Sequence, residues 1–172
     1  MDNFYPDMYA QSIYTINYKK LKKHGIKCLL FDLNNTLASY EAMYPDDKLR
    51  EFIFNLERDF KVIIVSNSNK NRLRPFKEKL NVDTSFSSKK PFNKKLKKIM
   101  NIYNFKDTEI TMIGDQLLTD IYGGNKMNFT TILVNSISEN EPFHTRFCRF
   151  FERKIIKKFN KKGLLIKGEY YE

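Results

Sequence analysis

The sequence predicts an α/β fold, a three-layer sandwich in which helices cover both faces of a mostly parallel, Rossmann-like sheet. Two observations support this prediction. Short apolar runs of strand length, such as residues 28–31 and 62–65, alternate with longer stretches of helical periodicity. Each apolar run ends in a polar cluster, as is typical where the strands of an open α/β sheet meet a ligand crevice. Alternation at this short spacing indicates right-handed crossovers between parallel strands.

The elements follow in order along residues 1–172, a length that suits one domain burying roughly 70% of its unfolded surface. Residues 1–26 are interpreted as a lead-in with a short helix near 18–23. The expected strands are 27–33, 62–65, 84–86, 110–113 and 129–134. The expected helices between them are 46–59, 70–80, 92–104 and 117–127, and a basic amphipathic helix follows at about 142–162.

Composition narrows the class of protein. No apolar run approaches the roughly 20 residues that a membrane span requires, and the first residues lack a signal-peptide pattern. Cys28 and Cys148 lie far apart, which indicates neither a disulfide framework nor a zinc site. We therefore expect a cytoplasmic protein.

The net charge of +11 is concentrated in two segments. Residues 146–162 hold eight Lys or Arg and one Glu, and residues 89–98 hold six Lys and no acid. Such clustering favours an anionic partner, namely phosphate groups, nucleic acid or an anionic membrane surface. The alternative is a basic surface that is merely solvated.

Polar side chains at the ends of the apolar runs predict a site. Asp32, Ser66 and Asp115 each follow a predicted strand, and Lys90 follows a shorter one. If these strands are neighbours, the four side chains converge on one crevice. Carboxylate oxygens suit Mg²⁺, while a hydroxyl and an ammonium suit a phosphoryl group. The alternative is that Asp32 and Asn34 are ordinary turn formers.

The same residues resemble the haloacid dehalogenase (HAD) superfamily of Mg²⁺-dependent phosphatases. Four motifs match in the right order over residues 28–120. Asp32 and Thr36 match the first motif, Asp-x-Asp-x-Thr, at the end of the first strand. Ser66 resembles the second motif, and Lys90, followed by Pro91, resembles the third. The fourth motif, Gly-Asp-x-x-x-x-Asp, is matched by the run from Gly114 to Asp120.

This resemblance implies hydrolysis through an aspartyl-phosphate, with Mg²⁺ as the cofactor. It implies that Asp32 is the nucleophile and that Lys90 holds the phosphate and the nucleophile together. The implied metal ligands are Asp32, Asp115 and the backbone carbonyl of Asn34, with Asp120 in the outer sphere. The implied substrate-binding residues are Thr36, Ser66, Asn67 and Lys90.

Finer features are similar to the YqeG-type group, which includes phosphatidylglycerophosphate phosphatases. The segments that carry this likeness are Ser12-Ile13-Tyr14, Gly114-Asp115-Gln116-Leu117, Thr119-Asp120 and Gly123-Gly124-Asn125. About 30 residues separate the first two motifs and about 24 the next two, which leaves no room for a cap domain. The resemblance therefore implies a capless class III phosphatase whose open site accepts a lipid phosphate such as phosphatidylglycerophosphate.

Asn34 departs from the family pattern, which has a second aspartate at this position. In the family, that aspartate protonates the leaving alkoxide and later activates water. An amide has no titratable proton near neutral pH and does neither. Loss of general acid–base help typically costs about 10²–10⁴-fold in rate. We expect slow turnover or a trapped phosphoenzyme, whether the asparagine is a natural divergence or an introduced change.

The basic helix predicted at 142–162 carries an aromatic stripe at a spacing of four residues, which consists of Phe143, Phe147, Phe151, Ile155 and Phe159. Aromatic residues surrounded by Lys and Arg fit a helix on an anionic membrane surface. The alternative is that the stripe packs on the sheet and the charges are solvated.

Two functions therefore remain open. The first is a Mg²⁺-dependent phosphomonoester hydrolase that acts on a lipid phosphate and is peripheral to the membrane. The second is a catalytically weak binding or assembly module that contacts RNA or a ribonucleoprotein through its basic surfaces.

Overall fold

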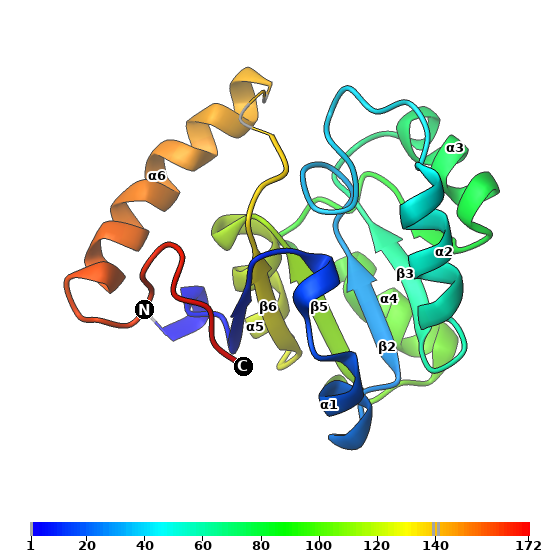
Figure 1. The fold of residues 1–172 in the computed structure, drawn as a ribbon, viewed down its shortest axis with the longest axis horizontal. Coiled ribbons are helices and arrows are strands. Elements are labelled where there is room, and N and C mark those ends of the chain that lie inside the picture. Colours follow the sequence, from blue (N-terminus) through cyan, green and yellow to red (C-terminus); the bar gives the residue numbers. More distant parts are fainter. Residues whose placement is uncertain (1, 139, 141) are drawn as a thin grey trace.

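The computed structural model describes residues 2–138, 140 and 142–172, and their centre is a six-stranded sheet (Figure 1). The strand order is β1-β6-β5-β2-β3-β4, and every pair of neighbouring named strands is parallel. The strands are β1 Met8–Ala10, β2 Cys28–Phe31, β3 Lys61–Val65, β4 Asp83–Ser85, β5 Ile110–Gly114 and β6 Thr130–Val134. The predicted α/β class with a mostly parallel sheet is confirmed.

The chain order of the strands creates a switch point next to β2. After β2 the chain adds β3 and β4 on one side, and it then crosses to add β5 and β6 on the other. Phe31 at the end of β2 pairs with Ile64 of β3 and Ile113 of β5, so the three strands end at the same level. The residues that follow them therefore emerge at one edge of the sheet, where ligands bind in open α/β folds.

Two apolar cores cover the faces of the sheet, because successive side chains of a buried strand point to opposite sides. Leu29 and Phe31 of β2 pack into the core that contains α1, α2 and α3. Cys28 and Leu30 pack into the core that contains α4. The predicted strands read as continuous apolar runs because both of their faces are buried.

Side-chain caps start the three helices α1, α2 and α3. The α-helices are α1 Tyr18–Lys23, α2 Asp47–Leu56, α3 Lys70–Leu80, α4 Lys94–Tyr103, α5 Tyr122–Asn125 and α6 Phe143–Asn160. The side chain of Asp46 accepts the N–H of Leu49 before α2, and that of Asn69 accepts the N–H of Arg72 before α3. In the described part of the chain, no helix has both the length and the hydropathy of a transmembrane span.

Several local predictions need correction. The lead-in at 1–26 contains α1 as expected, but it also contributes β1, which was not predicted. The helix predicted at 117–127 is a π-helix over Leu117–Ile121 followed by the short α5. The helix predicted at 92–104 starts only at Lys94, and Phe92 is 70% exposed rather than part of its buried face.

The C-terminal helix α6 stands beside the sheet, and the chain after it returns to β1 (Figure 1). Tyr9 of β1 and Tyr171 exchange backbone hydrogen bonds at 2.9 Å, so residues from the two ends of the described chain lie side by side. Phe159 of α6 is buried against Tyr9, Leu133 and neighbours in a third apolar cluster. The helix predicted at 142–162 is therefore docked on the domain through part of its surface.

Candidate active site at the carboxyl edge of the sheet

Three buried carboxylates meet at the ends of β2 and β5. Asp32 directly follows β2, and its N–H donates to the carbonyl of Ile113 at 2.9 Å, which continues the ladder with β5. Asp115 directly follows β5, and Asp120 lies one turn further on. One carboxylate oxygen from each of Asp32, Asp115 and Asp120 lies within 4.8 Å of the others. This edge therefore concentrates negative charge in a buried place.

Lys90 lies between two of these carboxylates. Its Nζ donates to Asp32 Oδ1 and to Asp120 Oδ1, each at 2.6 Å. Its side chain is 2% exposed. The sequence predicted that Lys90 would meet Asp32, and the contact with Asp120 is an addition from the structure. One ammonium thus bridges the residue after β2 and the fourth motif.

Burial perturbs these charges. Burial raises the pKa of Asp32 to about 7, with Lys90 opposing the rise and the neighbouring carboxylates adding to it. Burial also raises the pKa of Asp115, against the lowering effect of Arg149. Burial by itself disfavours the charged form of Lys90, but Asp120 and Asp32 outweigh it and raise the pKa of the ammonium. The site therefore holds Lys90 as a cation among carboxylates that lack full compensation.

Asp115 is held by residues from three other segments. Thr36 Oγ1 donates to Asp115 Oδ1 at 3.1 Å, and Ser136 Oγ donates to Asp115 Oδ2 at 2.6 Å. Arg149 of α6 pairs with the same Oδ2 and donates from Nη1 to the Asp115 carbonyl at 2.7 Å. The hydroxyl of Thr36 thus contacts a metal-ligand candidate, and its predicted role in substrate binding stays a prediction.

Asn34 follows the nucleophile candidate Asp32 by two residues. Asn34 Nδ2 donates to Ser68 Oγ at 2.8 Å, and Arg72 Nε donates to Asn34 Oδ1 at 3.1 Å. Arg72 also donates to the carbonyl of Ser39 at 2.9 Å and to that of Ala42. The amide is therefore oriented from both ends.

Ser66 and Asn67 follow β3 as predicted. Ser66 is 1% exposed, and its Oγ accepts the N–H of Ser68 at 3.2 Å. Asn67 Oδ1 accepts the N–H of Lys90 at 2.7 Å, and Asn67 Nδ2 donates to the Lys90 carbonyl at 3.2 Å. The amide of Asn67 thus holds the main chain of Lys90, and substrate binding by Asn67, which also lines the cavity described next, stays a prediction.

A cavity of about 380 Å³ opens above these residues. Its polar lining comes from the strand ends, and α6 with the segment before it supplies another wall. The lining residues are Asp32, Asn34, Tyr40, Ser66, Asn67, Ser68, Lys90, Gln116, Thr119, Pro142, Thr145 and Cys148. The described chain between Asp32 and Lys90 forms only sheet strands, their covering helices and loops, so no cap domain stands over this opening.

Gly114 shows why the fourth motif begins with glycine. A Cβ added at Gly114 would lie 2.2 Å from Oδ2 of Asp120. The Asp120 carboxylate therefore packs directly on the backbone of the residue before Asp115, an approach that a side chain would block. The N–H of Gln116 also donates to Asp120 Oδ2, at 3.2 Å. Asp120 is consequently fixed between Lys90 and this turn.

Sequence reasoning missed several polar residues of the site. Among them are the residues that contact Asn34 and Asp115 from a distance, Arg72, Ser136 and Arg149, and also Glu152. One signal did exist, because Glu152 is the single acid among eight Lys and Arg at 146–162 and stands three residues after Arg149. Glu152 Oε2 accepts from Arg149 at 3.0 Å, and Glu152 Oε1 accepts the N–H of Leu118 at 2.9 Å. A single acidic residue in a basic amphipathic helix can therefore indicate the face of the helix that is buried against the domain.

Comparisons with known proteins agree with this geometry. A family model described as haloacid dehalogenase-like hydrolase matches residues 2–134. "Probable phosphatase YqeG" of Bacillus subtilis is 35% identical over 161 residues, which cover 93% of this chain and 94% of that protein. "Phosphatidylglycerophosphate phosphatase 1, chloroplastic/mitochondrial" of Arabidopsis thaliana is 26% identical over 171 residues, 92% of this chain and 49% of that protein. The chain thus spans about half the length of the plant protein.

Among solved structures, a HAD-like family hydrolase from Porphyromonas gingivalis superposes with a TM-score of 0.55. It is 13% identical in sequence, and the match covers 73% of this chain and 98% of the other. At this identity the likeness shows the fold alone. The family model and the B. subtilis relative go further, since they match most of the sequence itself. The chain belongs to the haloacid dehalogenase-like hydrolase family.

Proposed function

We propose that the protein is a Mg²⁺-dependent phosphatase that hydrolyses a phosphomonoester on a lipid headgroup, with Asp32 as the nucleophile and with turnover slowed by Asn34. The observation that carries this proposal is the convergence of the Asp32, Asp115 and Asp120 carboxylates, two of which pair with Lys90. Membership of a hydrolase family and 35% identity to a probable phosphatase support it. The proposed place of action is the cytoplasmic side of a membrane.

The donor set fits Mg²⁺. Three carboxylate oxygens within 4.8 Å of one another are hard ligands, and the two cations that pair with them, Lys90 and Arg149, leave one negative charge unbalanced. We assign the metal to the carboxylates of Asp32 and Asp115 and the backbone carbonyl of Asn34, with Asp120 in the outer sphere. Bound Mg²⁺ would offset negative charge on the phosphoryl oxygens next to the Asp32 carboxylate.

The residues of the chain then divide the work of the reaction. A carboxylate oxygen of Asp32 attacks phosphorus, the bond from phosphorus to the alcohol oxygen breaks, and that oxygen leaves with the electron pair. Lys90 donates hydrogen bonds that hold the nucleophile and the phosphoryl group in one place. Ser66 lies beside them in the cavity wall as a phosphate-binding hydroxyl. Because Asn34 supplies no proton, the leaving alcohol oxygen takes one from solvent. Water then attacks phosphorus and gives a proton to solvent, and the bond to Asp32 breaks to release inorganic phosphate.

Asn34 limits both halves of this reaction. It lines the cavity beside Asp32, but an amide cannot protonate an alkoxide or take a proton from water. Hydrogen bonds from Arg72 and to Ser68 already orient the side chain at this position. An aspartate has nearly the same shape as asparagine and would occupy the same position, where Arg72 would stabilise its charged form. We therefore expect Asn34→Asp to raise steady-state phosphate release about 10²–10⁴-fold.

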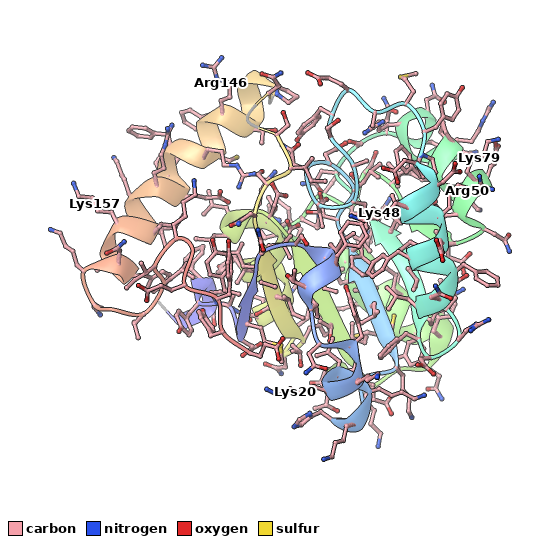
Figure 2. All side chains as sticks on the ribbon, viewed as in Figure 1. Lys20, Lys48, Arg50, Lys79, Arg146 and Lys157 are labelled. Carbon is pink, nitrogen blue, oxygen red and sulfur yellow. The ribbon has the colours of Figure 1, made fainter. Side chains whose placement is uncertain are left out.

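The outer face of α6 supports a membrane-bound substrate. Phe147, Phe150 and Phe151 are 60%, 49% and 42% exposed, and Lys154 lies over the ring of Phe150 at 4.5 Å. Figure 2 shows Arg146 and Lys157 on the side of α6 that faces away from the sheet. Aromatic rings and cations on one face suit the surface of an anionic bilayer. The inner side of the same helix lines the cavity through Thr145 and Cys148. A helix resting on lipid would thus bring the site to a headgroup phosphate.

One set of assays tests this proposal. Phosphate release is measured with and without Mg²⁺, on phosphatidylglycerophosphate in anionic vesicles and on p-nitrophenyl phosphate, for the protein and its Asn34→Asp variant. We expect Mg²⁺-dependent release by Asn34→Asp, lost when Asp32→Asn is added. Phe150→Ser should lower binding to vesicles and phosphate release from phosphatidylglycerophosphate, but it should leave phosphate release from p-nitrophenyl phosphate unchanged. Phe54→Ser, at a 65% exposed phenylalanine on α2, is the matched control. Metal-independent release, or none from either substrate, would contradict the proposal.

A basic groove beside α4 favours a second candidate, binding of RNA. A groove of about 840 Å³ is lined by Lys89, Lys94, Lys95, Lys97 and Lys98 together with the exposed Phe92 and Ile102. Lysines could track a backbone while an aromatic ring stacks on a base. If this candidate holds, affinity for single-stranded RNA will fall steeply with salt and will drop in Lys94→Gln and Lys97→Gln. Salt-independent binding would exclude it.

A further inference from the structure

We propose that Arg149 is a positioning residue for the metal-binding carboxylate Asp115, and that α6 is through this contact a part of the active site. The inference rests on the proposed Mg²⁺ site. It concerns a segment beyond the family match at residues 2–134.

The guanidinium of Arg149 holds one residue at two points. Its Nη2 contacts Oδ2 of Asp115, and its Nη1 donates to the backbone carbonyl of Asp115 at 2.7 Å. The Asp115 side chain is 0% exposed and that of Arg149 is 20% exposed. A planar guanidinium with several donors makes such a two-point contact, and an ammonium does not reproduce it. Arg149 thereby fixes the carboxylate relative to its own main chain.

Glu152 fixes the guanidinium in turn. Its Oε2 accepts from Arg149 Nη1 at 3.0 Å, and its Oε1 accepts the N–H of Leu118 at 2.9 Å. Leu118 lies in the π-helix that follows Asp115, so α6 is braced against the same turn that it contacts through Arg149. The Glu152 side chain is 2% exposed. This makes a closed connection from α6 to the end of β5.

The contacts divide the two oxygens of Asp115 between two tasks. Oδ2 accepts from Ser136 at 2.6 Å and from Arg149, while Oδ1 accepts from Thr36 at 3.1 Å. Oδ2 is therefore the oxygen that the protein holds in place, because it accepts one short and one charge-assisted hydrogen bond. This leaves Oδ1 as the oxygen that would bind the metal. Partners that orient a metal ligand in this way typically contribute 10–100-fold to metal affinity or activity.

The sign of the effect separates positioning from simple electrostatics. Arg149 is a cation close to the proposed cation site, and by charge alone its removal would tighten Mg²⁺ binding or leave it unchanged. Positioning predicts the reverse, because a carboxylate released from Arg149 must be ordered again when the metal binds. A contact that only holds α6 in place would lower thermal stability without changing metal affinity.

The test is Mg²⁺ affinity, measured by isothermal titration and by the Mg²⁺-induced rise in melting temperature, on the full chain. We expect Arg149→Gln to raise the dissociation constant for Mg²⁺ about 10–100-fold. Arg149→Lys keeps the charge but loses the two-point contact, and it should also weaken binding. Arg153→Gln removes the same charge from an exposed position of the same helix and should bind Mg²⁺ as the unsubstituted protein does. Circular dichroism is used to check that each variant is folded.

Unchanged or tighter Mg²⁺ binding by Arg149→Gln would overturn the positioning role and leave the proposed function standing. If Arg149→Gln does not fold, Mg²⁺ affinity is measured on Arg149→Lys instead. An affinity of Arg149→Lys equal to that of the unsubstituted protein would then overturn the positioning role. Absence of Mg²⁺ binding by the unsubstituted protein would overturn the proposed metal and the positioning role together.

Discussion

The two sides of the carboxylate cluster obtain their counter-ions from different parts of the chain. On one side, Lys90 bridges Asp32 and Asp120 at 2.6 Å, and all three residues lie within the family match. On the other side, Asp115 pairs with Arg149, which comes from α6 outside that match. Lys90 is 2% exposed and has no alternative partner in solvent, whereas Arg149 is 20% exposed and shares Asp115 with two hydroxyls.

The two cations thus differ in where they come from along the chain and in how far they are exposed. If the site hydrolyses a phosphomonoester as proposed, Lys90 contacts the phosphoryl group, and its place is set by the reaction. In the same proposal, Arg149 acts on geometry, because it holds the oxygen of Asp115 that lies away from the proposed metal. Removal of each cation in turn separates these two roles.

The largest expected effect on stability follows removal of Lys90. In Lys90→Met, the buried carboxylates of Asp32 and Asp120 lose their shared partner, and breaking a buried pair typically costs about 3–5 kcal/mol in the free energy of unfolding. Arg149→Met should cost less, about 1–3 kcal/mol, because Thr36 and Ser136 still donate to Asp115. Urea unfolding at pH 8, with a chelator present, measures the free energy of unfolding of both variants. Equal losses would remove the distinction between the two sides.

The next effect is a dependence of stability on pH. Because burial raises the pKa of Asp32 to about 7 from an ordinary value of 3.8, the folded protein keeps a proton that the unfolded chain releases. This contribution to stability is present below about pH 4 and is lost as pH rises to about 7. Without metal, the free energy of unfolding should fall across this window. If the proposed metal site is correct, Mg²⁺ should restore the free energy of unfolding near neutral pH, since it would bind the charged carboxylates.

Asp32→Asn is the control for this pH dependence, since an amide does not titrate. The slope that Asp32 contributes between about pH 4 and 7 should disappear in this variant. An unchanged slope would assign the titration to other groups.

The smallest expected effect is a difference between two substitutions of Glu152, which braces α6 against the turn after β5. In Glu152→Ala, the Arg149 guanidinium loses its partner and the N–H of Leu118 is left unpaired, at a cost of about 1–3 kcal/mol. Glu152→Gln keeps an oxygen that can accept the Leu118 N–H, so it should lose less than Glu152→Ala. Thermal unfolding compares the two variants. If both lose the same amount, the hydrogen bond to Leu118 contributes nothing.

The sequence was sufficient for the elements that local patterns encode. The runs that became β2, β3 and β5 are apolar throughout because the sheet is covered on both faces, and their polar ends located Asp32, Ser66 and Asp115. The strand β1, Met8–Ala10, was missed because it lies in the segment interpreted as a lead-in and is defined by its long-range pairing with β6. Local patterns thus found the centre of the sheet and the edge strand β4, but not the edge strand β1.

The sequence predicted the contact between Lys90 and Asp32, 58 residues apart, but not the partners that hold Asp115. The partners of Asp115 lie 79, 21 and 34 residues away, at Thr36, Ser136 and Arg149. The expected aromatic stripe of α6 was wrong as a single face, because a helix turns about 100° per residue and a spacing of four drifts around it. Phe147 is 60% exposed while Phe159 is 4% exposed, and the side chain of Phe143 lies outside the described residues.

The account depends on one covalent event at Asp32, and an aryl phosphate tests it most directly. The nitrophenolate leaving group of p-nitrophenyl phosphate needs no proton, so Asp32 should react even though Asn34 cannot act as an acid. Rapid mixing with Mg²⁺ should then give a burst of one nitrophenolate per site, followed by slow turnover. Mass spectrometry should find one phosphoryl group on the peptide that contains Asp32. A burst that persists in Asp32→Asn, or a phosphoryl group on another residue, would contradict the account.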